Sequence, residues 1–146
     1  MVNEEDFVPP VKEFAKEILE AREKDELEGF PVVLHAGESC ERRNDCLYDA
    51  ICLGTKRIGH GFKLASHPHL LEIVKRDKIC IECCPVSNLV LAYTLDLRTH
   101  PARSFLHQGI PVSISPDDPG FFGYEGVTLD YVYIFLAWEL NLADLK

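Results

Sequence analysis

Four short segments of this sequence end in polar side chains of the kinds that bind metal ions and transfer protons. Each polar group follows a run of apolar, often β-branched residues. A histidine and a glutamate end the first segment, a histidine between glycines ends the second, a serine and an asparagine follow the third, and two aspartates follow the fourth. These residues are His35, Glu38, His60, Ser87, Asn88, Asp117 and Asp118.

The residue types suit hydrolysis assisted by a metal ion. A neutral imidazole such as His35 and a carboxylate such as Asp117 are ordinary ligands of zinc. Zinc lowers the pKa of a bound water to about 7, which makes hydroxide available at neutral pH. Glu38 and His60 are then candidates for the proton transfers that such a hydroxide needs. Because adjacent residues of an extended chain point to opposite sides, one carboxylate of the pair Asp117-Asp118 can bind metal while the other faces the substrate.

Parallel strands joined by helices would bring all four segments to one edge. Apolar runs predict strands at 32–35, 57–61, 78–84 and 111–115, and apolar spacings of three and four predict helices at 11–27, 43–53, from Ser66 onward, at 99–108 and at 129–142. Strands that alternate with helices imply parallel pairing with helical crossovers. Active sites in such folds lie at the carboxyl ends of the strands, which meet at one mouth in a closed barrel. The predicted fold class is therefore α/β, with four βα units.

Size and charge restrict the function further. The chain has 146 residues, enough for one domain with a sizeable core, and no linker divides it. Its net charge of -9 disfavours binding to nucleic acid and to anionic membranes. No apolar run approaches the roughly 20 residues of a membrane span. We therefore expect a small-molecule substrate, with no nucleic acid and no membrane as partner.

The cysteines do not by themselves indicate a metal or redox site. There are six, an even number that permits disulfides without requiring them. Cys80 and Cys83 have the C-X-X-C spacing, but residues three apart in a strand face opposite sides, so the two thiols cannot chelate together. Small core residues are the better interpretation. Helix surfaces or helix caps are expected for the remaining histidines, His67, His69, His100 and His107.

Four blocks of the sequence resemble, in order and spacing, the adenosine deaminase family. The blocks are His35–Glu38, Arg57–Gly61, Cys84–Asn88 and Ser115–Pro119. Longer matches, at 57–64 with His67-Pro68 and at 96–98 with His100-Pro101, are most similar to the secreted adenosine deaminase growth factor branch. The resemblance extends from about Gly29 to Lys146.

This resemblance implies the C-terminal half of a (β/α)₈ TIM-type barrel, with residues 1–146 as a single unit and the first half absent. It implies zinc-dependent hydrolytic deamination of adenosine, or 2'-deoxyadenosine, to inosine and ammonia by a longer parent protein with one Zn²⁺ per site. By position, His35 and Asp117 would bind the zinc. Glu38 would bind the substrate and protonate its purine ring, and His60 would orient or deprotonate the zinc-bound water. Asp118 would accept a hydrogen bond on the far side of the purine, with Ser87 and Asn88 in support.

Two departures from the family pattern affect these expectations. The family supplies a His-X-His at the end of its first barrel strand; here His67-Pro68-His69 has that spacing but follows the second strand, at a helix start. Pro116 stands where Ser or Thr more often precedes the aspartates, and proline removes a backbone donor. The 146-residue chain alone is therefore expected to be inactive. A missing first half, or self-association, is expected to cover the edges of its sheet.

Other interpretations stay open. A catalytically inactive half-barrel that acts as an interaction module would explain the absent His-X-His. AMP deaminase, or another purine deaminase, would use the same scaffold, although no basic cluster near the strand ends supports a phosphate site. Asp117-Asp118 before Pro119 is also typical of a turn or helix cap, and Ser87-Asn88 is as typical of a turn as of a site. The growth factor branch favours an extracellular location, and a cytoplasmic one stays open.

Overall fold

Four short parallel strands form the sheet that positions the candidate site. The computed structural model describes residues 16–21, 23–24, 31–40 and 44–145. Each strand pairs with the next one along the chain, so the sheet order is β1-β2-β3-β4. This arrangement confirms the predicted α/β class with four βα units. The strands are β1 (Val33–Ala36), β2 (Arg57–His60), β3 (Cys80–Cys83) and β4 (Val112–Ile114).

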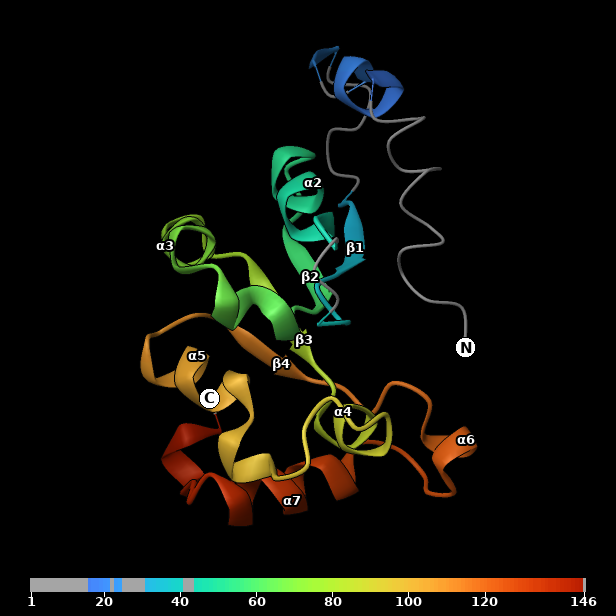
Figure 1. The fold of residues 1–146 in the computed structure, drawn as a ribbon, viewed down its shortest axis with the longest axis vertical. Helices are drawn as coiled ribbons and strands as arrows, with labels where there is room; N and C mark the ends of the chain where they lie inside the picture. The colour runs from blue at the N-terminus through green and yellow to red at the C-terminus, as the bar shows by residue number, and fades with distance from the viewer. Residues whose placement is uncertain (1–15, 22, 25–30, 41–43, 146) are drawn as a thin grey trace.

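Helices connect the strands and extend beyond the last one. In Figure 1, α2, α3 and α5 lie on the same side of the sheet, α4 lies beside α7, and α6 lies at the margin of the molecule. No helix of the described residues is long and apolar enough to cross a membrane. The α-helices are α2 (Cys46–Cys52), α3 (Pro68–Arg76), α4 (Pro85–Val90), α5 (Pro101–His107), α6 (Pro119–Phe122) and α7 (Thr128–Ala137), and the 3₁₀ helices are η2 (Phe62–Ser66), η3 (Leu97–Thr99) and η4 (Leu142–Asp144).

The two faces of the sheet differ in character. Strand residues point alternately to either face, and Ile58 and Ile81, which are paired in register, are both fully buried against the helices. Each such side chain stabilises the fold by about 1.5–3 kcal/mol. The core also contains Leu47, Leu64, Val74, Ile79, Ala102 and Phe105. The opposite face is exposed or half-buried and carries Val33, His35, Arg57, Cys80, Glu82 and Ser113.

Several predicted boundaries are wrong for local reasons. Ser66 is not the N-cap of α3; it ends η2, and His67 is the cap, with Pro68 in the first turn. The last helix ends at Ala137, well before residue 142, and Glu139 just beyond it has a φ of 56°, which a helix cannot contain. The predicted helix at 43–53 is shorter, at Cys46–Cys52. Residues 16–21 of the predicted first helix are helical, and most of its remainder lies outside the described residues.

Two segments that seemed irregular from the sequence are helical. The turn considered at Ser87 and Asn88 is instead the middle of α4, because Pro85 suits the first position of a helix. Residues 120–122, which no predicted helix included, belong to α6. Of the two cysteines with the C-X-X-C spacing, Cys83 is fully buried in the core, as predicted, whereas Cys80 is half-buried on the open face of the sheet.

Candidate functional site

The first two strands place two histidine rings side by side at the edge of the sheet. His35 pairs in register with Gly59, and Ala36 with His60. The ring centroids of His35 and His60 are 5.2 Å apart. Gly59 permits this approach, because a Cβ at that position would lie 2.9 Å from Cγ of His35. His35 is exposed on the open face of the sheet, whereas His60 is buried.

A tight turn after β1 brings Glu38 back towards His60. Gly37 has a φ of 66°, in the left-handed region that favours glycine. A Cβ there would also lie 2.7 Å from the side chain of Leu47. Oε2 of Glu38 lies 3.7 Å from Nε2 of His60. This separation exceeds that of a hydrogen bond but is short enough for an electrostatic interaction.

The segment after β4 brings Asp117 close to the same ring nitrogen of His60. Oδ2 of Asp117 lies 3.9 Å from Nε2 of His60 and accepts a hydrogen bond of 2.7 Å from the hydroxyl of Ser87. His60 and Asp117 have φ values of 62° and 60°, which are uncommon for residues other than glycine. Such strained positions cluster at functional sites. The structure thus brings together three predicted residues, Glu38, His60 and Asp117, from three strand ends.

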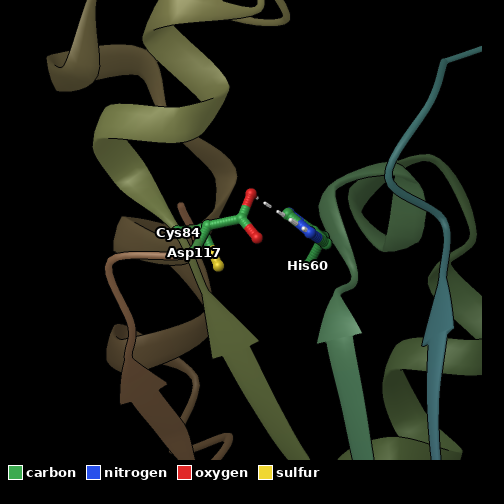
Figure 2. Close-up of side chains that lie close together, drawn as sticks. All are labelled: His60, Cys84 and Asp117. Carbon is green, nitrogen blue, oxygen red and sulfur yellow. Dashed lines mark ion pairs between the residues drawn. The ribbon is translucent and has the colours of Figure 1, made fainter. Parts of the chain in front are cut away.

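Cys84 lies in the same place, although the sequence did not single it out. Its Sγ, a ring nitrogen of His60 and a carboxylate oxygen of Asp117 all lie within 4.8 Å of one another. Figure 2 shows the three side chains facing one another beyond the ends of the strands. Cys84 directly follows β3, so the rule that polar groups follow strand ends could have found it. Burial raises the pKa of the Cys84 thiol, which stays neutral unless a cation displaces its proton.

Burial makes His60 a neutral imidazole at pH 7. It lowers the pKa of His60 from 6.5 to about 4, and the opposing influence of Asp117, which favours the protonated ring, is smaller. Among the described residues, Nδ1 of His60 is buried without a hydrogen-bond partner. A neutral imidazole in this position is able to accept a proton or to bind a metal ion.

The side chains gathered here are of the types that bind zinc, but they differ from the predicted pair of ligands, His35 and Asp117. Imidazole, thiolate and carboxylate are all zinc ligands. The compact group in the described part of the chain consists of His60, Cys84 and Asp117, and it does not include His35. His35 instead adjoins this group through the ring of His60. The assignment of His35 and Asp117 as the zinc ligands therefore stays a prediction.

Asp118 is next to the group but is turned to solvent. It is exposed at the N-cap of α6, where its carbonyl oxygen accepts the amides of Phe121 at 3.0 Å and Phe122 at 3.1 Å. Asp118 thus occupies the cap position that we considered for this pair, but its side chain forms no cap hydrogen bond. The expected extended geometry of the two aspartates is wrong, because the left-handed backbone of Asp117 turns the chain between them.

Ser87 and Asn88, the two residues expected to support the site, have different partners. Ser87 and Asn88 are both fully buried in α4. Ser87 contacts Asp117, as described above. The side-chain oxygen of Asn88 instead lies 3.0 Å from Nε2 of His100, which in turn caps α5 through Nδ1. His100 is therefore a helix cap, as expected, but a buried one.

One buried carboxylate near the site was not predicted. Asp130 in α7 is fully buried, accepts the amide of Val86 at 3.2 Å and lies 3.0 Å from the hydroxyl of Tyr124. Burial raises the pKa of Asp130. A single acidic residue inside the apolar run 129–137 was the available signal, since buried carboxylates need partners.

Comparison with known proteins identifies the family. The model of the family described as adenosine deaminase matches residues 2–144. Adenosine deaminase 2 of Dictyostelium discoideum is 43% identical over 148 residues, which cover 100% of this chain and 27% of that protein. Adenosine deaminase of Lutzomyia longipalpis is 40% identical over 149 residues, which cover 100% of this chain and 28% of that protein. The chain thus spans little more than a quarter of the length of these relatives.

Solved structures share the fold. Adenine deaminase from Arthrobacter aurescens superposes with a TM-score of 0.75 at 24% identity, over 90% of this chain and 38% of that one. An amidohydrolase from Burkhoderia ambifaria with bound Zn gives 0.70 at 24% identity, over 90% and 36%. Arabidopsis ADAL complexed with IMP gives 0.70 at 17% identity, over 91% and 45%. In each case this chain covers less than half of the matched chain. On this family match and these relatives, the chain belongs to the adenosine deaminase family.

Proposed function

We propose that this chain is the C-terminal half of a (β/α)₈ barrel that converts adenosine, or 2'-deoxyadenosine, to inosine and ammonia by zinc-dependent hydrolysis. The observation that carries the proposal is the convergence of Glu38, His60 and Asp117 at the carboxyl edge of the sheet, in a chain of this family. Both carboxylates lie within 4 Å of Nε2 of His60. The rest of the barrel would cover the open face of the sheet and supply the remaining zinc ligands.

Each residue has a role that its surroundings support. Zinc, held by His35 and Asp117 with ligands from outside this chain, would make water nucleophilic at neutral pH. His60, neutral because it is buried, accepts the proton that the attacking water loses. Glu38 donates a proton to the purine nitrogen next to the carbon under attack, which makes that carbon more electrophilic. Asp118, which is exposed beside Asp117, accepts a hydrogen bond from the far side of the purine.

The charges near the strand ends favour a nucleoside over a nucleotide. Arabidopsis ADAL binds IMP, so this fold accepts a phosphate in at least one protein. Here Arg57, just before the His60 segment, pairs with Glu82 at 2.6 Å. Lys63, just after it, is buried and donates to the carbonyl of Asn44 at 2.7 Å. Because both cations are engaged within the chain, neither is presented to a phosphate group.

Zinc analysis of the longer protein, combined with a spectrophotometric adenosine assay, tests the proposal. We expect one zinc per chain and turnover of adenosine that exceeds turnover of AMP. A metal-free and inactive full-length protein would refute it. The 146-residue chain alone should be inactive, because it supplies only two of the proposed zinc ligands, His35 and Asp117, where catalytic zinc sites have three. An inactive half-barrel that serves as an interaction module remains the second candidate, and a full-length protein with bound zinc and turnover would exclude it.

A further inference from the structure

We propose that Asp130 is a positioning residue that fixes Asp117 through two separate routes, one to its side chain and one to its backbone. The inference rests on the proposed function, in which Asp117 binds zinc. Asp130 lies in α7, thirteen positions further along the sequence than Asp117. It is fully buried, and each of its carboxylate oxygens has a different partner.

The first route reaches the carboxylate of Asp117 through α4. Oδ1 of Asp130 accepts the amide of Val86 at 3.2 Å. This amide lies in the first turn of α4, where Pro85 has no N–H and the cap residue Cys84 offers no side-chain bond. The next residue, Ser87, donates its hydroxyl to Oδ2 of Asp117 at 2.7 Å. Asp130 therefore anchors the turn that presents the Ser87 hydroxyl.

The second route reaches the backbone just before Asp117. The hydroxyl of Tyr124 lies 3.0 Å from Oδ2 of Asp130 and 3.2 Å from the carbonyl oxygen of Pro116. Pro116 has no amide hydrogen, so this carbonyl is its only backbone group able to form a hydrogen bond. Asp117 then adopts a φ of 60°. A residue other than glycine keeps this backbone conformation only when its surroundings hold it there.

A count of hydrogens shows how the two routes join at Asp130. Tyr124 has one hydroxyl hydrogen and faces two oxygens, the carbonyl of Pro116 and Oδ2 of Asp130. Both contacts use this single hydrogen, so the hydroxyl links Asp130 to the backbone at Pro116. An asparagine at position 130 would keep both routes, because its oxygen could accept the amide of Val86 and its amide nitrogen could donate to Tyr124, which would donate to Pro116. Alanine would remove both routes.

The test compares Asp130→Ala, Asp130→Asn and Tyr124→Phe in the longer protein. Tyr131→Phe is the matched control, because Tyr131 is on the same helix, is 37% exposed and makes no hydroxyl hydrogen bond within the described residues. Zinc affinity is measured on folded protein by competition with a chromophoric chelator, and kcat and KM are measured separately with adenosine. The rate at which a thiol reagent modifies Cys84 is followed by mass spectrometry. This rate reports on the first turn of α4 and can be measured in the absence of metal.

We expect Asp130→Ala to weaken zinc binding about 10- to 100-fold, the usual effect of losing support behind a metal ligand. Tyr124→Phe should weaken it between about two- and tenfold, the equivalent of one hydrogen bond. Both should lower kcat with little change in KM, while Asp130→Asn and Tyr131→Phe resemble the wild type. Wild-type zinc affinity and kcat in folded Asp130→Ala would overturn the inference, and so would an Asp130→Asn variant as impaired as Asp130→Ala.

Failure of the proposed function would give a different result. If the wild-type longer protein binds no zinc, the proposed function fails, and Cys84 reactivity then decides the inference alone. Cys84 is buried at the cap of α4, so loss of the Asp130 anchor should accelerate its modification in Asp130→Ala and Tyr124→Phe. Equal rates in all the variants would overturn the inference in that case.

Discussion

Replacement of Gly59 by alanine should displace the ring of His35 while leaving the fold intact. Gly59 lies in β2, in register with His35 on β1. An added Cβ would lie 2.9 Å from Cγ, 3.0 Å from Nδ1 and 3.1 Å from Cδ2 of His35. Carbon atoms in optimal contact are about 3.5–4.0 Å apart, so the ring must move by roughly 0.6–1.1 Å. This shift acts on a predicted zinc ligand.

Gly59→Ala should reduce the catalytic rate far more than it reduces the stability of the fold. His35 is exposed on the open face of the sheet, so in this chain its ring has room to move away. The loss of stability should therefore be near the lower limit for overpacking, about 1 kcal/mol. A misplacement of about 1 Å in a catalytic group can reduce the rate about 100-fold. We expect a reduction of that order in kcat of the longer protein, together with weaker zinc binding.

Gly120→Ala is the matched control for this experiment. A Cβ at Gly120 would meet nothing within 4 Å, and Gly120 has no left-handed backbone to strain. Both variants are assayed with adenosine at saturating zinc, and their zinc affinities are measured by chelator competition. If Gly59→Ala retains the kcat and zinc affinity of Gly120→Ala, then the position of the His35 ring does not matter to the site and the reasoning fails.

Two further predictions concern single titratable side chains. Glu38→Gln should reduce kcat about 10²- to 10⁴-fold with zinc content unchanged, because the amide cannot donate the proton that general acid catalysis needs; unchanged kcat would exclude Glu38 as the acid. Burial lowers the pKa of His100 to about 4, below its value of 6.5 in the unfolded chain. Between pH 4 and pH 6.5 the unfolded chain therefore binds more protons than the folded chain. The contribution of His100 to the free energy of unfolding should be fully present above pH 6.5 and should be lost as the pH falls towards 4. Protonation would place a hydrogen on Nδ1, which accepts the amide of Ala102 at 3.1 Å. Urea unfolding at pH 7 and pH 5 should show this loss in the wild type and a smaller one in His100→Asn, and equal pH dependence in both would contradict the assignment.

The strand ends could be predicted because two simple signals coincide there. Each strand is a short segment with at least one β-branched residue, and a titratable side chain lies at its end or within three residues after it. Parallel pairing then places those side chains at one edge, whatever the details of the helices. This reasoning placed Glu38, His60 and Asp117 correctly, and it would have placed Cys84 if a thiol had been counted with the polar groups.

The remaining features depend on contacts that are distant in the sequence. The left-handed backbone at His60 and Asp117 has no local signal, because neither residue type requires it. Asp130 meets Val86 across 44 positions, and only the packing of α7 against α4 brings them together. The six-residue helix α4 is too short to show a helical period, so Ser87 and Asn88 looked like turn residues.

The ion pair on the open face of the sheet offers a test of whether another half of the barrel covers this chain. Nε of Arg57 lies 2.6 Å from Oε1 of Glu82, and the two side chains are 42% and 24% exposed. An ion pair in contact with water contributes about 0–1 kcal/mol. If a first half of the barrel covers this face, then the pair is buried, and Glu82→Gln leaves Arg57 without its charged partner at a cost of about 3–5 kcal/mol.

The same substitution should therefore have two different effects. Unfolding in urea of the 146-residue chain should show a loss below about 1 kcal/mol for Glu82→Gln, and that of the longer protein a loss several times larger. The double variant Arg57→Met with Glu82→Met should recover most of the loss in the longer protein, because it removes both charges and keeps the volume. Equal, small losses in the two proteins would mean that the open face stays in contact with water. In that case the half-barrel would not be closed by the rest of the protein, and His35 would lack the surroundings that a zinc ligand needs.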